Sequence, residues 1–278
     1  RNFLKTGGIA LLGSLATGSA MALTTPGALG GEGADKKAAV ALAMNHFGVS
    51  EADLKKVLAA ALEKGGDYAD LFFEHTISNS IRLMDGAVNN SYSNIDYGVG
   101  VRVLIGDQSG YAYVENITVE DMLKAARTAA RIASANKGNK PLNLTEKELK
   151  KNYYTVASPW EEVSLKDKMP YLQKLNDRIF ALDKRVHKVQ ASQSDTTSHI
   201  FFCNSEGVMF YDYRPMVTLG AVCIMEEDGK TENGYAARAY RRGFDFLSDE
   251  VVDVIAREAV DQTSLLFKAI KPKGGEMP

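Results

Sequence analysis

The sequence predicts an α+β protein of two successive modules, each an antiparallel β-meander flanked by helices. Three observations lead to this class. Strand-like runs follow one another across hairpin-sized turns, whereas a doubly wound parallel sheet would alternate strands with helices. One pattern of turns and glycine-rich strands occurs twice, its copies ending in Gly110-Tyr111-Ala112 and Gly234-Tyr235-Ala236. A long helical pattern follows each copy, which indicates one structural unit used twice.

Length and composition fit this organisation. The 278 residues allow two domains of ordinary size, and the 45% hydrophobic and 24% charged content is typical of a folded protein. The formal net charge is −2 and no basic stripe is present, so binding of nucleic acid has no electrostatic support.

Residues 1–22 have the features of an export signal. Arg1-Asn2-Phe3-Leu4-Lys5 has the spacing of a twin-arginine signal, and Ala20-Met21-Ala22 is a small-x-small cleavage site. Only one arginine is present and the chain begins with Arg, which suggests that preceding residues are missing. The stretch between is too short and too polar for a stable membrane anchor. We therefore expect a periplasmic protein exported by the twin-arginine route, with residues 23–45 as a flexible linker.

The first domain is predicted over residues 46–136. Ser50 caps a helix that Gly65-Gly66 stops, and Thr118 caps a second helix that ends near Ser134. The strands expected between them cover residues 68–77, 80–84, 87–93, 97–105 and 109–115, with tight turns at Asp85-Gly86 and Gly106-Asp107.

A polar connector at 137–150 separates this domain from a middle domain at 151–270, and 271–278 is expected to begin a linker. Ser164 and Ser248 cap its two helices, which end near Leu182 and Ala269. The stretch from Asp195 to Ser198 is polar and suits an exposed hairpin tip. Five strands are expected, at Val186–Asp195, His199–Asn204, Val208–Tyr213, Val217–Met225 and Gly234–Arg241.

The two cysteines, Cys203 and Cys223, each lie in an apolar strand-like run. We expect two buried thiols, although an exported protein could also join them in a single bridge.

The sequence lacks most of the residue patterns that mark catalytic sites. None of His46, His75, His187 and His199 has another histidine three to five residues away, as a helical zinc site requires. His75 is predicted to be an ordinary surface or sheet histidine. His187 and His199 could approach each other across strands, yet no carboxylate or cysteine completes a ligand set.

Other motifs point to structure rather than chemistry. No G-x-S-x-G sequence is present. Gly98-x-Gly100 lacks a third glycine and precedes a strand, so it favours close strand packing over phosphate binding. Arg241-Arg242 could bind a peptide carboxylate, but the edge of the sheet is the favoured interpretation. No catalytic, cofactor-binding or metal-ligating residue is predicted from these patterns.

Arg102 is the one candidate for a site. It is the only charged residue in the apolar run Val99–Ile105 and faces away from Val101 and Val103. It could line a cleft or a domain interface; a salt bridge to a neighbouring carboxylate is the favoured alternative.

The stretch from Ala69 to Ala133 contains, in this order, Ile81-Arg82, Asp85-Gly86, Gly98–Val103 and Gly110-Tyr111-Ala112. Through these residues it resembles the first domain of the TldD/PmbA family of zinc metallopeptidases. The second module resembles that family's middle domain through Phe202–Gly207, Gly234-Tyr235-Ala236 and the helix that leads into Lys271-Pro272-x-Gly274.

This resemblance implies zinc-dependent proteolysis of peptides or unfolded protein segments, by a homo- or hetero-dimer. The catalytic signature of the family, His-Glu-x-x-x-His, lies in a third domain that begins after a segment like 271–278, and this sequence does not contain it. Zinc is therefore expected in the full-length protein but not in this chain, which should be inactive alone. Two alternatives stay open: a non-catalytic partner or scaffold subunit of the same family, and a periplasmic peptide-binding module.

Overall fold

A computed structural model describes residues 36–133, 143–146, 156–270 and 274–275. The predicted export signal at 1–22 lies outside the described residues, as do parts of the expected linker (23–45), connector (137–150) and final segment (271–278). From residue 36 the expected linker is helical, because Lys36–Phe47 forms α1. This corrects the linker prediction for 36–45: the glycines and proline that suggested a linker come earlier, whereas this part is rich in the good helix formers Ala, Leu and Met.

The strands form one sheet in the order β3-β2-β1-β5-β6-β4, with β7 also paired to β6. All neighbours are antiparallel except β4 and β6. The α+β class is confirmed. The strands are β1 (Tyr68–Met84), β2 (Ala87–Ile105), β3 (Gln108–Val114), β4 (Thr145–Glu146), β5 (Val186–Asn204), β6 (Val208–Glu227) and β7 (Lys230–Tyr240).

The two meanders share this sheet because β1 pairs with β5 along almost its whole length, from Asp70 opposite Asn204 to Met84 opposite Gln190. β1, β2, β5 and β6 are continuous strands of 17, 19, 19 and 20 residues. The breaks predicted inside them are absent.

The stretch from Asp195 to Ser198 is therefore not a hairpin tip. It lies inside β5, where Asp195 and Thr197 are only 2% and 1% exposed. Lateral hydrogen bonds replace apolar packing there: Thr76 Oγ1 donates to Ser198 Oγ at 2.8 Å, and Asn79 Nδ2 donates to Asp195 Oδ1 at 3.0 Å. A polar strand paired in this way has the composition of a turn, so sequence pattern alone could not identify it.

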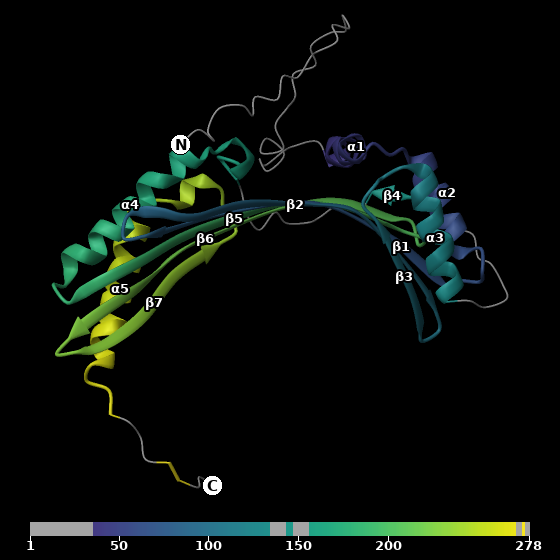
Figure 1. Ribbon diagram of the computed structural model, residues 1–278. Coiled ribbons are helices and arrows are strands. Elements are labelled where there is room, and N and C mark those ends of the chain that lie inside the picture. The colour runs from purple at the N-terminus through teal and green to yellow at the C-terminus, as the bar shows by residue number, and fades with distance from the viewer. Residues whose placement is uncertain (1–35, 134–142, 147–155, 271–273, 276–278) are drawn as a thin grey trace, which may run out of the picture.

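The sheet is arched, and the helices lie on its outer side at the two ends (Figure 1). One end carries α1, α2 (Glu51–Leu62) and α3 (Val119–Ile132); the other carries α4 (Leu165–Leu182) and α5 (Asp249–Leu266). Two 3-10 turns, η2 (Trp160–Glu162) and η3 (Phe244–Phe246), accompany α4 and α5. The predicted N-caps Ser50, Thr118, Ser164 and Ser248 all precede their helices. The side-chain oxygens of Ser50, Thr118 and Ser248 accept from first-turn N–H groups that would otherwise be unpaired. At Ser164 the Asp167 carboxylate accepts from the Ser164 N–H and hydroxyl. Among the described residues, no helix has the length and apolar character needed to cross a membrane.

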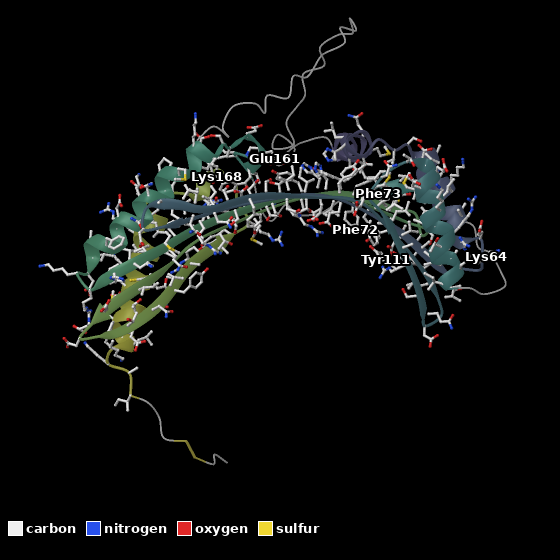
Figure 2. The ribbon with its side chains drawn as sticks, viewed as in Figure 1. Lys64, Phe72, Phe73, Tyr111, Glu161 and Lys168 are labelled. Atoms are coloured by element: carbon white, nitrogen blue, oxygen red, sulfur yellow. The ribbon has the colours of Figure 1, made fainter. Side chains whose placement is uncertain are left out.

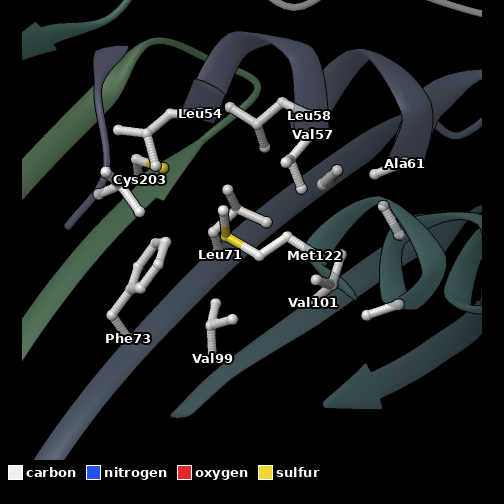
Figure 3. Packing of buried hydrophobic residues seen from close by; sticks show 14 of the residues in the cluster. Leu54, Val57, Leu58, Ala61, Leu71, Phe73, Val99, Val101, Met122 and Cys203 are labelled. Atoms are coloured by element: carbon white, nitrogen blue, oxygen red, sulfur yellow. The ribbon is translucent and has the colours of Figure 1, made fainter. Parts of the chain in front are cut away.

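Each end of the arch has its own hydrophobic core. The first is packed around Leu54, Leu71, Phe73 and Met122 (Figure 3). The second is packed around Trp160, Leu172, Leu219 and Ile255.

The cysteines are distributed between these cores. Cys203 belongs to the first and Cys223 to the second, and both are free thiols, so the alternative of a single bridge is wrong. Burial raises the pKa of both thiols, which keeps them protonated and unreactive near neutral pH.

The repeated glycines mark close approaches between helix and strand. A Cβ on Gly110 of β3 would lie 2.0 Å from the Ala129 carbonyl oxygen of α3, and one on Gly234 of β7 would lie 2.6 Å from Thr263 Oγ1 of α5. The repeated motif thus encodes the docking of one helix onto the outermost strand of each half.

Tyrosines next to these glycines lie across the opposite face of the sheet. The Tyr111 ring covers Gly100, whose Cβ would meet its hydroxyl at 2.6 Å, and the Tyr235 hydroxyl approaches Gly220 in the same manner at 3.1 Å. In each copy, the glycine therefore lets a helix pack closely on one face of the sheet, and the tyrosine covers a glycine of the neighbouring strand on the other face.

Candidate functional site

Arg102 forms the salt bridge that was its favoured alternative. Its Nε and Nη2 donate to Asp70 Oδ2 at 2.9 and 2.6 Å, from the neighbouring strand. Asp70 is buried, whereas the arginine side chain is half-exposed and lies 5.9 Å from the centre of the Tyr68 ring. The pair anchors an aromatic surface on the inner side of the arch.

That inner surface continues across the sheet. Phe72 on β1 is opposite Gly100 on β2 and Phe202 on β5, and the Phe202 and Phe210 rings stack at 5.0 Å. Figure 2 shows Phe72 and Tyr111 on the inner side of the arch and Phe73 on the helix-covered side. We call Tyr68, Phe72, Arg102, Tyr111, Phe202 and Phe210 the inner aromatic surface.

A histidine cluster lies on the opposite, outer side. His46 of α1 contacts His75 of β1 with 2.8 Å between Nε2 and Nδ1, and its ring stacks on His199 of β5 at 4.7 Å between ring centres. His199 contacts Glu161 of η2 and the Tyr211 hydroxyl, at 3.1 and 2.7 Å.

This cluster corrects one sequence-based alternative, the approach of His187 to His199 across strands. His199 meets His75 and His46 rather than His187, which is exposed and lies 3.9 Å from Glu226. A carboxylate does accompany His199, but Glu161 comes from a distant turn that no local spacing could reveal. Among the residues with described side chains, no group of three His, Cys, Asp or Glu has an arrangement able to hold a metal ion.

The surroundings favour neutral imidazoles at α1 and β1. Burial, followed by the proximity of His199 and His75, lowers the pKa of His46 from 6.5 to about 4. Burial and His199 also lower the pKa of His75. Burial alone would raise the pKa of Glu161, but hydrogen bonds from His199 and Tyr213 outweigh it and lower that pKa.

We expect α1 to undock in mild acid. A histidine with a lowered pKa in the docked state stabilises docking fully above pH 6.5 and loses that contribution as the pH falls from 6.5 towards about 4. The equilibrium constant for docking of α1 should fall by up to about tenfold for each pH unit and each such imidazole. Glu161 offsets part of this by stabilising the imidazolium forms, whereas the facing Tyr97, Tyr211 and Tyr213 stay neutral.

Amide hydrogen exchange of α1 between pH 7.5 and 4.5 would measure this loss. His46→Gln should move it to lower pH, and His187→Gln, which alters an exposed histidine far from α1, should leave it unchanged. Equal protection of α1 at both ends of the pH range would contradict the prediction.

A buried ion pair lies beside the histidine cluster. Lys168 Nζ of α4 is 2.5 Å from Asp195 Oδ2 of β5, and both side chains are almost fully buried. Gln193 Nε2 and Asn79 Nδ2 also donate to the Asp195 carboxylate. The Lys168 ammonium lies 5.3 Å from the centre of the Trp160 ring. Both oxygens of this carboxylate therefore have donors, and the buried ion pair links α4 to β5.

Two segments of the chain match domain models of one protein family. Residues 69–133 match the model of PmbA/TldA metallopeptidase domain 1, and residues 158–267 match that of the PmbA/TldA metallopeptidase central domain. The two matches together cover more than half of the chain, in the order expected from the resemblance.

The chain is also similar in sequence to curated proteins that are named metalloproteases. A Haemophilus influenzae protein named "Metalloprotease TldD homolog" is 32% identical over 222 residues, covering 76% of this chain and 45% of the relative. The Methanocaldococcus jannaschii "Metalloprotease MJ0996" is 26% identical over 219 residues, covering 75% and 47%. The chain thus spans about half the length of the curated relatives it matches.

Solved structures share the fold. A Thermotoga maritima protein described as a candidate modulator of a DNA gyrase has a TM-score of 0.63 at 18% identity, covering 81% of this chain and 50% of its own. TldE from Thermococcus kodakarensis has a TM-score of 0.57 at 16% identity, with coverages of 76% and 47%. With both domain models matched in order, this chain belongs to the TldD/PmbA family of metallopeptidases.

Proposed function

We propose that this chain is the N-terminal portion of an exported, periplasmic, zinc-dependent metallopeptidase that acts on peptides or unfolded protein segments. In this proposal the two halves form walls of the substrate cleft and contribute dimer contacts. Export follows the twin-arginine route, on the evidence of the sequence Arg1-Asn2-Phe3-Leu4-Lys5.

The inner aromatic surface is the observation that carries the proposal. All five α-helices cover the outer side of the arch, and no helix among the described residues covers its inner side (Figure 1). Aromatic rings supply large apolar contacts that tolerate many side chains, and an arginine beside them adds donors for carboxylates and carbonyls. Such a surface suits extended peptides of varied sequence.

The described residues do not fit the catalytic zinc, because none of their His, Cys, Asp and Glu groups converges as a ligand set. Zinc, when bound elsewhere in the full-length protein, would lower the pKa of a bound water near neutrality and so supply the nucleophile for hydrolysis. The names of the curated relatives support a metal in the family. The part assigned to this chain is to bind and orient the peptide.

Peptide hydrolysis by the full-length protein tests the enzyme class. We expect cleavage that a chelator abolishes and zinc restores, and no cleavage by the 278-residue chain alone. Chelator-sensitive cleavage by the chain alone would overturn its expected inactivity. Peptide binding without cleavage by the full-length protein would favour the non-catalytic partner or peptide-binding alternative.

The same assay locates the substrate surface. Tyr111→Ala should raise KM for peptides several-fold with kcat nearly unchanged, because it removes binding shared by the ground state and the transition state. Ile132→Ala on α3 is a matched control, since both side chains are 58% exposed and Ile132 belongs to a helix on the outer side. Equal effects of the two substitutions would count against the inner surface as the peptide wall.

A further inference from the structure

The edge of β2 that faces away from β1, its outer edge, has no partner strand among the described residues along more than half of its length. β3 pairs with β2 only from Val99 to Ile105, and no described residue pairs with the outer edge of residues 87–98. Except at Gly98, every residue of this segment is exposed. Its other edge is in regular antiparallel register with β1 from Asn90 onward. Within the described part of the chain, this open edge therefore presents an extended backbone whose outward N–H and C=O groups have no strand partner.

Apart from a bulge at Asn89, this edge lacks the features by which proteins prevent strands from associating. Exposed edges are usually protected by lysines, prolines, other charges or bulges. Residues 87–98 contain no Lys, Arg, Glu or Pro, and Asp96 is their only charged residue. The outermost strand at the other end, β7, carries Lys230, Glu232 and Arg238. The unprotected segment thus differs from the edge that the same sheet protects.

The sequence of the segment is symmetric about Tyr92. Residues 90–94 read Asn-Ser-Tyr-Ser-Asn, which is the same in both directions. In an antiparallel pair of identical strands related by a two-fold axis, residue 92 faces its own copy, residue 91 faces 93, and residue 90 faces 94. Every directly opposed pair in this stretch then joins identical residue types: Asn with Asn, Ser with Ser and Tyr with Tyr.

We infer that this open edge pairs with the same edge of a second copy, forming a two-fold symmetric homodimer whose sheet is continuous across the axis at Tyr92. The inference rests on the dimer contact in the proposed function and assigns it to named residues.

Geometry and charge both suit this pairing. Residues 90–94 would pair regularly, and residues 95–97 would face residues 87–89 across the bulge at Asn89. This overlap allows up to about ten main-chain hydrogen bonds, similar to the number in an ordinary protein interface. Opposed Asn and Ser side chains can hydrogen-bond, and the two Tyr92 rings, each 60% exposed in one copy, can stack at the axis. The two Asp96 carboxylates would lie about 27 Å apart, beyond the range of electrostatic repulsion in physiological salt.

The oligomeric state of the chain tests the inference without any peptidase assay, so failure of the proposed enzyme function would not affect the outcome. By analytical ultracentrifugation we expect a dimer for the unaltered chain. Tyr92→Lys and Tyr92→Glu should each raise the Kd of the dimer by about tenfold or more, because like charges then face each other at the axis. Tyr113→Lys is the matched control: this tyrosine is 66% exposed on β3, and its substitution should leave the Kd unchanged.

Mixing the two Tyr92 variants gives the most direct test of pairing at this axis. Equimolar Tyr92→Lys and Tyr92→Glu chains should associate with each other more tightly than either does with itself, since opposite charges then meet on the axis. A monomeric unaltered chain, a dimer insensitive to both Tyr92 substitutions, or a mixture that fails to recover association would each overturn the inference.

Discussion

Lys168→Met should lower the free energy of unfolding by about 3–5 kcal/mol, because it leaves the buried Asp195 carboxylate without its cation. The two remaining donors, from Gln193 and Asn79, are neutral amides and cannot balance a full charge. Denaturation by urea, monitored through Trp160 fluorescence beside the pair, would measure the loss.

Two comparisons separate the buried charge from other effects of the substitution. Lys174→Met on the same helix removes a lysine whose ion pair with Asp249 is exposed on both sides, so it should cost about 1 kcal/mol or less. Adding Asp195→Asn to Lys168→Met should recover a large part of the loss, since the unpaired charge disappears. If the double substitution is no more stable than Lys168→Met, an unpaired carboxylate is not the cause.

Gly110→Ala should destabilise the first core by about 3 kcal/mol, at the upper end of the usual cost of overpacking. The new Cβ would lie 2.0 Å from the Ala129 carbonyl oxygen and 3.1 Å from Ala133 Cβ, and a helix backbone cannot yield as a flexible side chain can. Gly234→Ala should act on the second core in the same way, through Thr263 and Ala259 of α5.

Thermal unfolding of these variants would show whether the repeated glycine has the same role twice. Ser109→Ala, an exposed change next to Gly110 on β3, should shift stability by no more than about 0.5 kcal/mol. A Gly110→Ala protein as stable as the Ser109→Ala protein would mean that α3 can move away from β3 at little cost.

Features determined by neighbouring residues were predictable from the sequence. The caps at Ser50, Thr118, Ser164 and Ser248 depend on a residue and the helix that it starts, and all four are confirmed. The turns after Met84 and Ile105 were also predicted, because Asp85-Gly86 and Gly106-Asp107 permit the backbone conformations that tight turns need.

Features that depend on lateral pairing were not predictable. The centre of β5 appeared to be a turn because its polar groups are satisfied by β1 and by α4, which sequence spacing does not show. The histidine cluster joins α1, β1, β5 and η2, and only the pairing of His75 opposite His199 brings its members together. The alternation of apolar residues along β1 could have placed His75 on the same face as Phe73, which was a usable signal.

The continuity of β1, β2, β5 and β6 has a consequence for how the protein tolerates insertions and deletions. At about 3.3 Å per residue these strands extend about 55–65 Å, and they alone set the distance between the two cores. One added residue would turn every following side chain to the wrong face, and two added residues would lengthen one strand against three neighbours that stay the same. The four paired strands must therefore all have the same length between the two cores. Insertions and deletions should be confined to the turns and helices at either end.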